Sequence, residues 1–259
     1  MNIVVCVKKV PEIDQVTIQD GIVTSSGAGM TNPFDMYAIE EAIRQKETQG
    51  GEITALTFGP ENSDSALREA LSLGADKAMR IWDDAAQNSD IAATAKILAA
   101  GIKKVGNVKL ILFGKQAVDN DASSIAAATA GYLDFPQIMF VKKIREINEE
   151  KAVVERATED GFDVVESSLP VVISVVKEIN EPRLPSLKGK MKAKKAGIEV
   201  LSLSDIGLDA GKAGVSGSSS KLIESQDPPA RPKGEMIEGS TPDEIADTLV
   251  AKLKDAKII

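Results

Sequence analysis

The chain has 259 residues, of which 43% are hydrophobic, so it can bury one sizeable core and leave a modest appendage. Its formal net charge of -8 argues against the large basic face that broad nucleic-acid binding requires. It has no histidine and one cysteine, Cys6, which excludes an intrachain disulfide, the usual zinc sites and histidine-dependent catalytic arrangements. We therefore expect an acidic carrier or enzyme from a reducing compartment, without a metal site.

The N-terminus enters an apolar run after two residues, and no basic region or cleavage segment precedes that run. No stretch approaches the roughly twenty apolar residues of a membrane span. We expect a cytoplasmic protein, or one of the mitochondrial matrix if the source is eukaryotic.

Apolar runs alternate with amphipathic stretches through the first half of the chain. The runs cover residues 3–7, 53–58, 78–82 and 108–113 and lack polar alternation, as strands covered on both faces do. Helices are predicted from Asn32 to about Lys46, and over residues 63–73, 90–104 and 125–130. Strands that alternate with helices predict an α/β fold with a parallel sheet.

The second half of the chain has a different residue pattern. Paired β runs cover residues 138–147 and 152–156, followed by residues 162–167 and 171–176, which we interpret as a β extension of the same domain. From Leu203 the chain is rich in Gly, Ser and Pro, a composition that does not bury a core. We predict a domain over residues 1–203 and a C-terminal arm over residues 204–259, ending in a helix capped by Thr241.

Neither a G-x-G-x-x-G turn nor a Walker-type phosphate loop is present. Ligands of open α/β sheets bind beyond the carboxyl ends of the strands, which here read Thr57-Phe58-Gly59-Pro60 and Phe113-Gly114-Lys115-Gln116. The polar loop 114–124 leads into the alanine-rich helix, whose free N–H groups can attract an anion such as a nucleotide phosphate. The alternative is that Asp121 or Ser123 merely caps this helix.

Residues 184–195 form a basic segment with alternate lysines, which is usually a solvated surface. Leu184 and Leu187 are apolar residues in this polar loop, so a docking role is the competing interpretation. Cys6 lies inside an apolar strand, where packing is far commoner than a reactive thiol.

Seven segments, taken together and in order, resemble the β subunit of electron transfer flavoproteins. They are Met1–Val10, Asn32–Phe34, Leu71–Asp76, Gly114–Asp119, Leu133–Gln137, Asn180–Arg183 and Met191–Lys195. The resemblance implies an adenine nucleotide alpha hydrolase-like fold and a heterodimer whose α subunit holds most of the FAD. It also implies that this subunit binds a structural AMP and is an electron carrier without catalytic residues of its own.

The resemblance also assigns binding residues. The AMP contacts map onto Cys6, Asn32, Pro33, Phe34, Asp35, Phe58, Gly114, Lys115, Gln116, Ala117, Val118, Asp119, Asn120, Asp121, Ala122, Ser123, Ser124 and Ile125. The loop 184–195 resembles a recognition loop that docks acyl-CoA dehydrogenases of fatty acid β-oxidation, with Leu187 as the anchor and Leu184 and Met191 beside it. Electrons would then pass to a quinone-reducing oxidoreductase.

Three positions depart from the family pattern. Ile125 stands where the family often has a hydroxyl that binds phosphate, and Ser123 and Ser124 are the candidates to replace it. Ala157 stands where a glutamate often holds the partner's mobile FAD domain, and Glu159 is the candidate replacement. Ile13 stands where some relatives place a tyrosine near the flavin ring.

Two alternatives stay open at this point. One is an electron-bifurcating β subunit, which binds a second FAD in place of AMP and works with NADH. Those relatives tend to carry Asp-Gly-Asp-Thr where this chain has Asp119-Asn120-Asp121-Ala122, so AMP is favoured. The other is a stand-alone nucleotide-binding module of the stress-protein or ATP pyrophosphatase type, which would leave the long arm unexplained.

Overall fold

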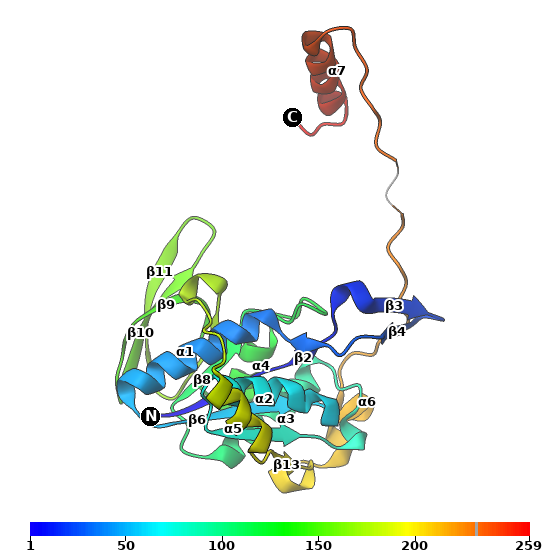
Figure 1. Ribbon diagram of the computed structural model, residues 1–259. Coiled ribbons are helices and arrows are strands. Elements are labelled where there is room, and N and C mark those ends of the chain that lie inside the picture. The colour runs from blue at the N-terminus through cyan, green and yellow to red at the C-terminus, as the bar shows by residue number, and fades with distance from the viewer. Residues whose placement is uncertain (231–232) are drawn as a thin grey trace. The chain divides into compact units, whose positions relative to one another are not determined.

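The computed structural model describes residues 1–230 and 233–259 (Figure 1). The chain divides into two compact units, Met1–Glu224 and Ser225–Ile259. Among the helices of these described residues, none has the length and apolar character needed to cross a membrane.

A nine-stranded sheet forms the centre of the first unit. Its order is β11 (Phe162–Ser168), β10 (Lys151–Ala157), β9 (Gln137–Ile147), β12 (Val171–Val175), β8 (Leu110–Gly114), β1 (Asn2–Cys6), β6 (Glu52–Phe58), β7 (Lys77–Ile81) and β13 (Glu199–Leu201). All neighbours from β9 to β13 pair in parallel, whereas β10 pairs antiparallel with both β9 and β11. The predicted α/β fold with a parallel sheet and a β extension is confirmed.

The extension is smaller than the sequence indicated. The run 171–176 was assigned to it, but β12 lies inside the parallel sheet between β8 and β9. All five residues of β12 are buried, which fits a strand covered on both faces. Figure 1 shows β10 and β11 as a hairpin that extends away from the helical layers.

Helices cover both faces of the sheet. One face packs against α1 (Pro33–Gln49), α2 (Asp64–Leu73) and α5 (Leu187–Lys195), and the other against α3 (Ile91–Val105) and α4 (Ile125–Leu133). Side chains of β1 alternate between the layers: Val5 packs in the first, and Val4 and Cys6 pack in the second. Every β1 side chain from Ile3 onward is therefore buried, which explains the unbroken apolar run.

Several short elements carried little sequence signal. Two small antiparallel pairs are β2 (Lys9–Val10) with β5 (Met30–Thr31) and β3 (Val16–Gln19) with β4 (Ile22–Ser25). Asp20 and Gly21 both have positive φ at the β3–β4 turn, so the Asp-Gly pair is the one hairpin signal that the sequence carries here. One-turn 3-10 helices cover Ile13–Gln15, Glu61–Ser63, Asp84–Ala86, Lys177–Ile179, Ser204–Ile206 and Ala210–Lys212.

The segment expected as a loop at 184–195 contains a helix, α5, from residue 187 onward. The Ser186 side chain caps it by accepting a hydrogen bond from the Gly189 N–H (3.0 Å). Ala193 is buried against the first face, and the Arg68 guanidinium donates to its carbonyl oxygen (2.8 Å). The helix is thus held by one buried alanine, the hydrogen bond from Arg68 and its cap, while its lysines stay in water.

The first unit extends to Glu224, beyond the expected boundary at residue 203. Leu203 and Ala213 are buried in the second core layer, and α6 (Gly214–Gly217) follows them. These apolar residues anchor the start of a stretch whose composition otherwise indicates an arm. In the second unit, Thr241 caps α7 (Pro242–Asp255) by accepting from the Glu244 N–H (3.3 Å), as its sequence predicts.

We predict that Gly114→Ala destabilises the fold by roughly 1–3 kcal/mol, because the start of α1 packs directly on this glycine. A methyl group there would meet Asp35 Oδ1 at 2.5 Å and the carbonyl carbon of Phe34 at 2.6 Å. The matched control is Gly131→Ala in α4, where the added methyl meets nothing within 4 Å. Chemical denaturation should show a loss for the first and none for the second, and equal midpoints would contradict the close packing.

Candidate functional site

The strand order reverses at β1, which lies between β6 and β8. The chain passes from β1 to β6 on one side and returns to β8 on the other side, so loops leave the sheet in opposite directions here. Such a switch point is where open α/β sheets bind ligands, outside the carboxyl ends of the strands. A cavity of about 960 Å³ lies at this place, lined by Cys6, Phe58 and Gly114 at the three strand ends.

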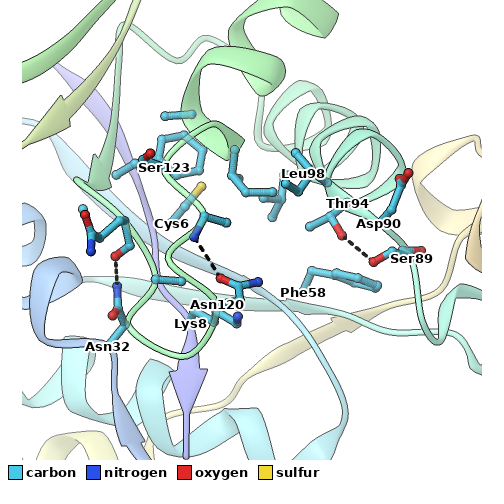
Figure 2. A pocket seen from close by; sticks show the side chains of 18 of the residues that line it. Cys6, Lys8, Asn32, Phe58, Ser89, Asp90, Thr94, Leu98, Asn120 and Ser123 are labelled. Carbon is cyan, nitrogen blue, oxygen red and sulfur yellow. Dashed lines mark hydrogen bonds between the residues drawn. The ribbon is translucent and has the colours of Figure 1, made fainter. Parts of the chain in front are cut away.

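Most of the residues proposed from the sequence line this one cavity. They are Cys6, Asn32, Asp35, Phe58, Gly114, Lys115, Gln116, Ala117, Asn120, Ala122, Ser123 and Ile125. Six others do not line it, namely Pro33, Phe34, Val118, Asp119, Asp121 and Ser124. Figure 2 shows Cys6, Phe58, Leu98 and Ser123 around the same opening.

The side chain of Asn32 joins two walls of the cavity. Its Nδ2 donates to Asp35 Oδ1 (3.0 Å) in the first turn of α1 and to the Gln116 carbonyl oxygen (2.8 Å). Its Oδ1 accepts from the Val118 N–H (3.2 Å). Asn32 is therefore a brace between the start of α1 and the loop after β8, rather than a conventional side-chain cap of α1.

Asp35 is buried directly beneath the cavity. Burial raises the pKa of its carboxyl group to about 7, although hydrogen bonds from Asn32 and from the Lys8 N–H (2.8 Å) act in the opposite direction. The group is therefore partly neutral near pH 7, which lowers its repulsion of an anion. Burial, and then the charge of Asp35, also raise the pKa of the Cys6 thiol well above its usual range. The thiol stays protonated, in agreement with a packing role.

The loop between β8 and α4 folds back on itself. The Gln116 side chain donates to Asp121 Oδ1 (2.8 Å), and Lys8 Nζ lies 2.6 Å from Asp119 Oδ2. Asp119 and Asp121 thus shape the loop without lining the cavity.

The N-terminus of α4 has no side-chain cap. Ser124 occupies the cap position but makes no capping hydrogen bond, and the Asp121 carboxylate is engaged by Gln116. Neither Asp121 nor Ser123 serves as the cap that would have explained this loop without a ligand. Ser123, Ile125 and Ala126 line the cavity, so the free N–H groups of the first turn lie at its wall. This arrangement suits a phosphate group.

A third wall was missed from the sequence. Residues 88–91 precede and begin α3, and Thr94 and Leu98 follow on the same helix. They lie at the cavity because β7 ends at the same sheet edge as its neighbours. Val215, Ser220, Lys221 and Leu222 complete this wall, and their composition had suggested only an arm.

The residues proposed for partner recognition lie elsewhere in the first unit. The Leu184 side chain is 90% exposed and Leu187, the first residue of α5, is 77% exposed. Leu187 and Met191 line a shallow depression together with Lys188, Lys192 and Lys195. An apolar patch framed by ammonium groups suits a partner surface that is apolar at its centre and acidic at its rim.

An ion-pair cluster anchors the chain just before this patch. The guanidinium of Arg183 donates to Glu40 Oε2 (2.8 Å) and to Glu47 Oε1 (2.6 Å), both on α1. Asn180 adds a hydrogen bond to the Tyr37 carbonyl oxygen (3.1 Å). Burial raises the pKa of Glu40, but the hydrogen bonds from Arg183 and Arg44 together outweigh it, so its pKa is lowered. The hydrogen bond from Arg183 lowers the pKa of Glu47 as well.

Of the three departures from the family pattern, two lie outside the cavity, whereas Ile125 lines it. Ile13 is 70% exposed in a one-turn 3-10 helix, Ala157 ends β10, and Glu159 is exposed in the turn after it. Ile125 begins α4 and presents an apolar side chain where a hydroxyl was expected.

Comparison with known proteins gives a consistent result. The family model described as electron transfer flavoprotein domain matches residues 20–206. The caffeyl-CoA reductase-Etf complex subunit CarD of Acetobacterium woodii is 40% identical, with both chains covered in full. Electron transfer flavoprotein subunits beta are 37% identical in Thermoanaerobacterium thermosaccharolyticum, over all of both chains, and in Mycobacterium bovis, over 97% of this chain and 98% of the relative. The chain therefore belongs to the electron transfer flavoprotein family, with the β subunits.

Proposed function

We propose that this chain is the AMP-binding β subunit of a heterodimeric electron transfer flavoprotein and acts as a carrier, not as an enzyme. It holds AMP in the cavity at the strand-order reversal and supports an FAD that the α subunit binds for the most part. That FAD, when bound, supplies the electron-accepting chemistry of the complex. The bacterial origin of the relatives supports a cytoplasmic location.

The uncapped N-terminus of α4 is the observation that carries the AMP proposal. Free N–H groups and the hydroxyl of Ser123 face a cavity that also has Lys8 and Lys115 in its lining, so one anion is accommodated. Phe58, Phe113 and Leu98 supply apolar surface for a base. A nucleotide monophosphate combines these two requirements.

A second candidate is the bifurcating type, in which this cavity holds FAD. The cavity volume of about 960 Å³ lies at the upper end of the range for small-molecule sites and leaves room beyond AMP. Asn120 and Ala122 both line the cavity, at positions where bifurcating relatives tend to have Gly and Thr. Loss of that hydroxyl at Ala122 favours AMP.

The exposed patch of Leu187 and Met191 is the proposed docking site for an acyl-CoA dehydrogenase, which delivers electrons that leave for a quinone-reducing oxidoreductase. Arg183 holds the preceding segment on α1, so the patch is presented on a fixed base. In the second unit, α7 carries the exposed apolar residues Ile245, Leu249 and Val250, which suit contact with the α subunit.

Expressed alone, the chain should retain AMP but little FAD, because the cavity offers a single helix N-terminus for phosphate. Mass analysis of the nucleotide released by denaturation checks this. Copurification with the α subunit should then yield AMP and flavin in equal amounts. Flavin in an amount equal to the isolated chain would reject AMP in favour of the bifurcating type.

The affinity for AMP should fall as the pH rises through about 7, because Asp35 becomes charged beside an anionic ligand. The added repulsion amounts to roughly 1 kcal/mol, or about fivefold. Titration calorimetry near pH 6 and pH 8 should show a larger fall in AMP affinity for the parent than for Asp35→Asn, whose side chain does not ionise. If the ratio of the AMP affinities at pH 6 and pH 8 is the same in both proteins, the charge of Asp35 does not affect AMP binding.

Leu187→Ala should weaken docking to an acyl-CoA dehydrogenase by about 2 kcal/mol, roughly thirtyfold, because an anchor side chain is lost. Electron transfer from the reduced dehydrogenase should slow, while dithionite reduces the flavin as before. Val200→Ala on β13, an exposed apolar residue outside the patch, is the matched control and should behave like the parent. Unchanged electron transfer in Leu187→Ala would contradict docking at this patch and show that it is only a solvated surface.

A further inference from the structure

The segment 214–222 follows the buried Ala213 and forms part of the cavity wall, yet the sequence placed it in an arm outside the nucleotide-binding domain. Val215, Ser220, Lys221 and Leu222 line the same cavity as the loop 114–124. Leu222 is 75% exposed, so this apolar side chain stands at the cavity without being buried in the core. Burial of the segment's own side chains therefore does not explain its position.

One carboxylate holds the segment in place. Asp90 Oδ2 accepts hydrogen bonds from the Ser219 N–H (2.7 Å), the Ser220 N–H (2.9 Å) and the Ser220 hydroxyl (3.1 Å). The Asp90 N–H in turn donates to Ser218 Oγ (2.9 Å). Hydrogen bonds to an ionised acceptor are about twice as strong as neutral ones.

The base of the segment is docked on the same loop. The Gly214 N–H donates to Ser89 Oγ (2.8 Å), and Ser218 Oγ donates to the Gly214 carbonyl oxygen (2.6 Å). Gly214 has a φ of +59°, and a Cβ there would lie 2.1 Å from the Ala85 carbonyl oxygen. The backbone at Gly214 therefore lies closer to the loop before α3 than a residue with a Cβ could.

Asp90 also caps α3, because its Oδ1 accepts a hydrogen bond from the Ala93 N–H (2.9 Å). The two carboxylate oxygens therefore serve different purposes: one caps the helix and the other holds the segment. Ser89 and Asp90 line the cavity themselves, so the segment and the loop that holds it form one continuous wall. Figure 2 shows Ser89, Asp90 and Thr94 together at this side.

We propose that the segment 214–222 completes the third wall of the nucleotide site, and that Asp90 is the positioning residue that holds it against bound AMP. The inference rests on the proposed function. Lys221 adds a positive charge and Leu222 an apolar surface to a site otherwise built from strand ends. Release of the nucleotide then requires the hydrogen bonds between Asp90 and the segment to break, so that this wall moves away from AMP.

The test uses Asp90→Asn in the full chain assembled with the α subunit. Asparagine caps helices as well as aspartate does, so α3 keeps its cap. The amide nitrogen that replaces Oδ2 cannot accept from Ser219 and Ser220. Ser219→Pro removes the shortest of the three hydrogen bonds to Oδ2 from the segment's side, because proline has no N–H. Asp205→Asn is the matched control, since Asp205 accepts from the N–H and hydroxyl of Ser202 outside the cavity.

Two readouts are independent of electron transfer. Trp82 is the only tryptophan of this chain, and its ring lies 5.8 Å from that of Phe58, which lines the cavity. Its fluorescence, taken as the difference from a Trp82→Phe complex, can therefore follow AMP release. Tryptic cleavage after Lys221, compared with cleavage after Lys233 in the same chain, reports how firmly the segment is held. Circular dichroism confirms that each variant is folded.

Both Asp90→Asn and Ser219→Pro should release AMP about tenfold faster than the parent and should be cleaved faster at Lys221, whereas Asp205→Asn should match the parent. Faster cleavage with an unchanged release rate would overturn the inference, because the segment would then be held by Asp90 without contributing to the site. Unchanged cleavage and release would overturn it as well. A parent protein without AMP would instead refute the proposed function.

Discussion

A single buried amide, the side chain of Asn32, joins the two elements on which the cavity depends. It donates to Asp35 in the first turn of α1 and to the Gln116 carbonyl oxygen, and it accepts from the Val118 N–H. The sheet alone fixes only where β1 and β8 end. The loop after β8 leads into α4. By holding this loop, the Asn32 amide fixes the position of the start of α1 relative to the N-terminus of α4, where we propose that phosphate binds. The third wall is tied separately, through Asp90, so two polar side chains organise most of the site.

The electrostatics of the cavity follow from burial and from backbone groups more than from surface charge. The chain carries a net charge of -8, which would repel a nucleotide at long range. Locally, burial raises the pKa of Asp35 to about 7, and the first turn of α4 presents N–H groups without a side-chain cap. An acidic protein can therefore offer one restricted site for an anion.

The sequence predicted the central strands β1, β6, β7 and β8 well, because they are buried on both faces and therefore read as unbroken apolar runs. It also predicted much of the cavity lining, since the carboxyl ends of parallel strands share one edge. It missed α5, because alternate lysines conceal a helix held by Ala193 and a cap at Ser186. It missed the segment 214–222 for a related reason: hydrogen bonds to Asp90, over 120 residues away in sequence, leave no local pattern.

The central claim is that AMP binds where β1, β8 and the N-terminus of α4 meet. Hydrogen–deuterium exchange of the heterodimer, with and without AMP, measures the location directly. The account predicts slower exchange of the backbone N–H groups over residues 114–127, in the loop and first turn of α4, and no change in the β10–β11 hairpin. Slowing confined to the lysines of α5, or no slowing over residues 114–127, would contradict it.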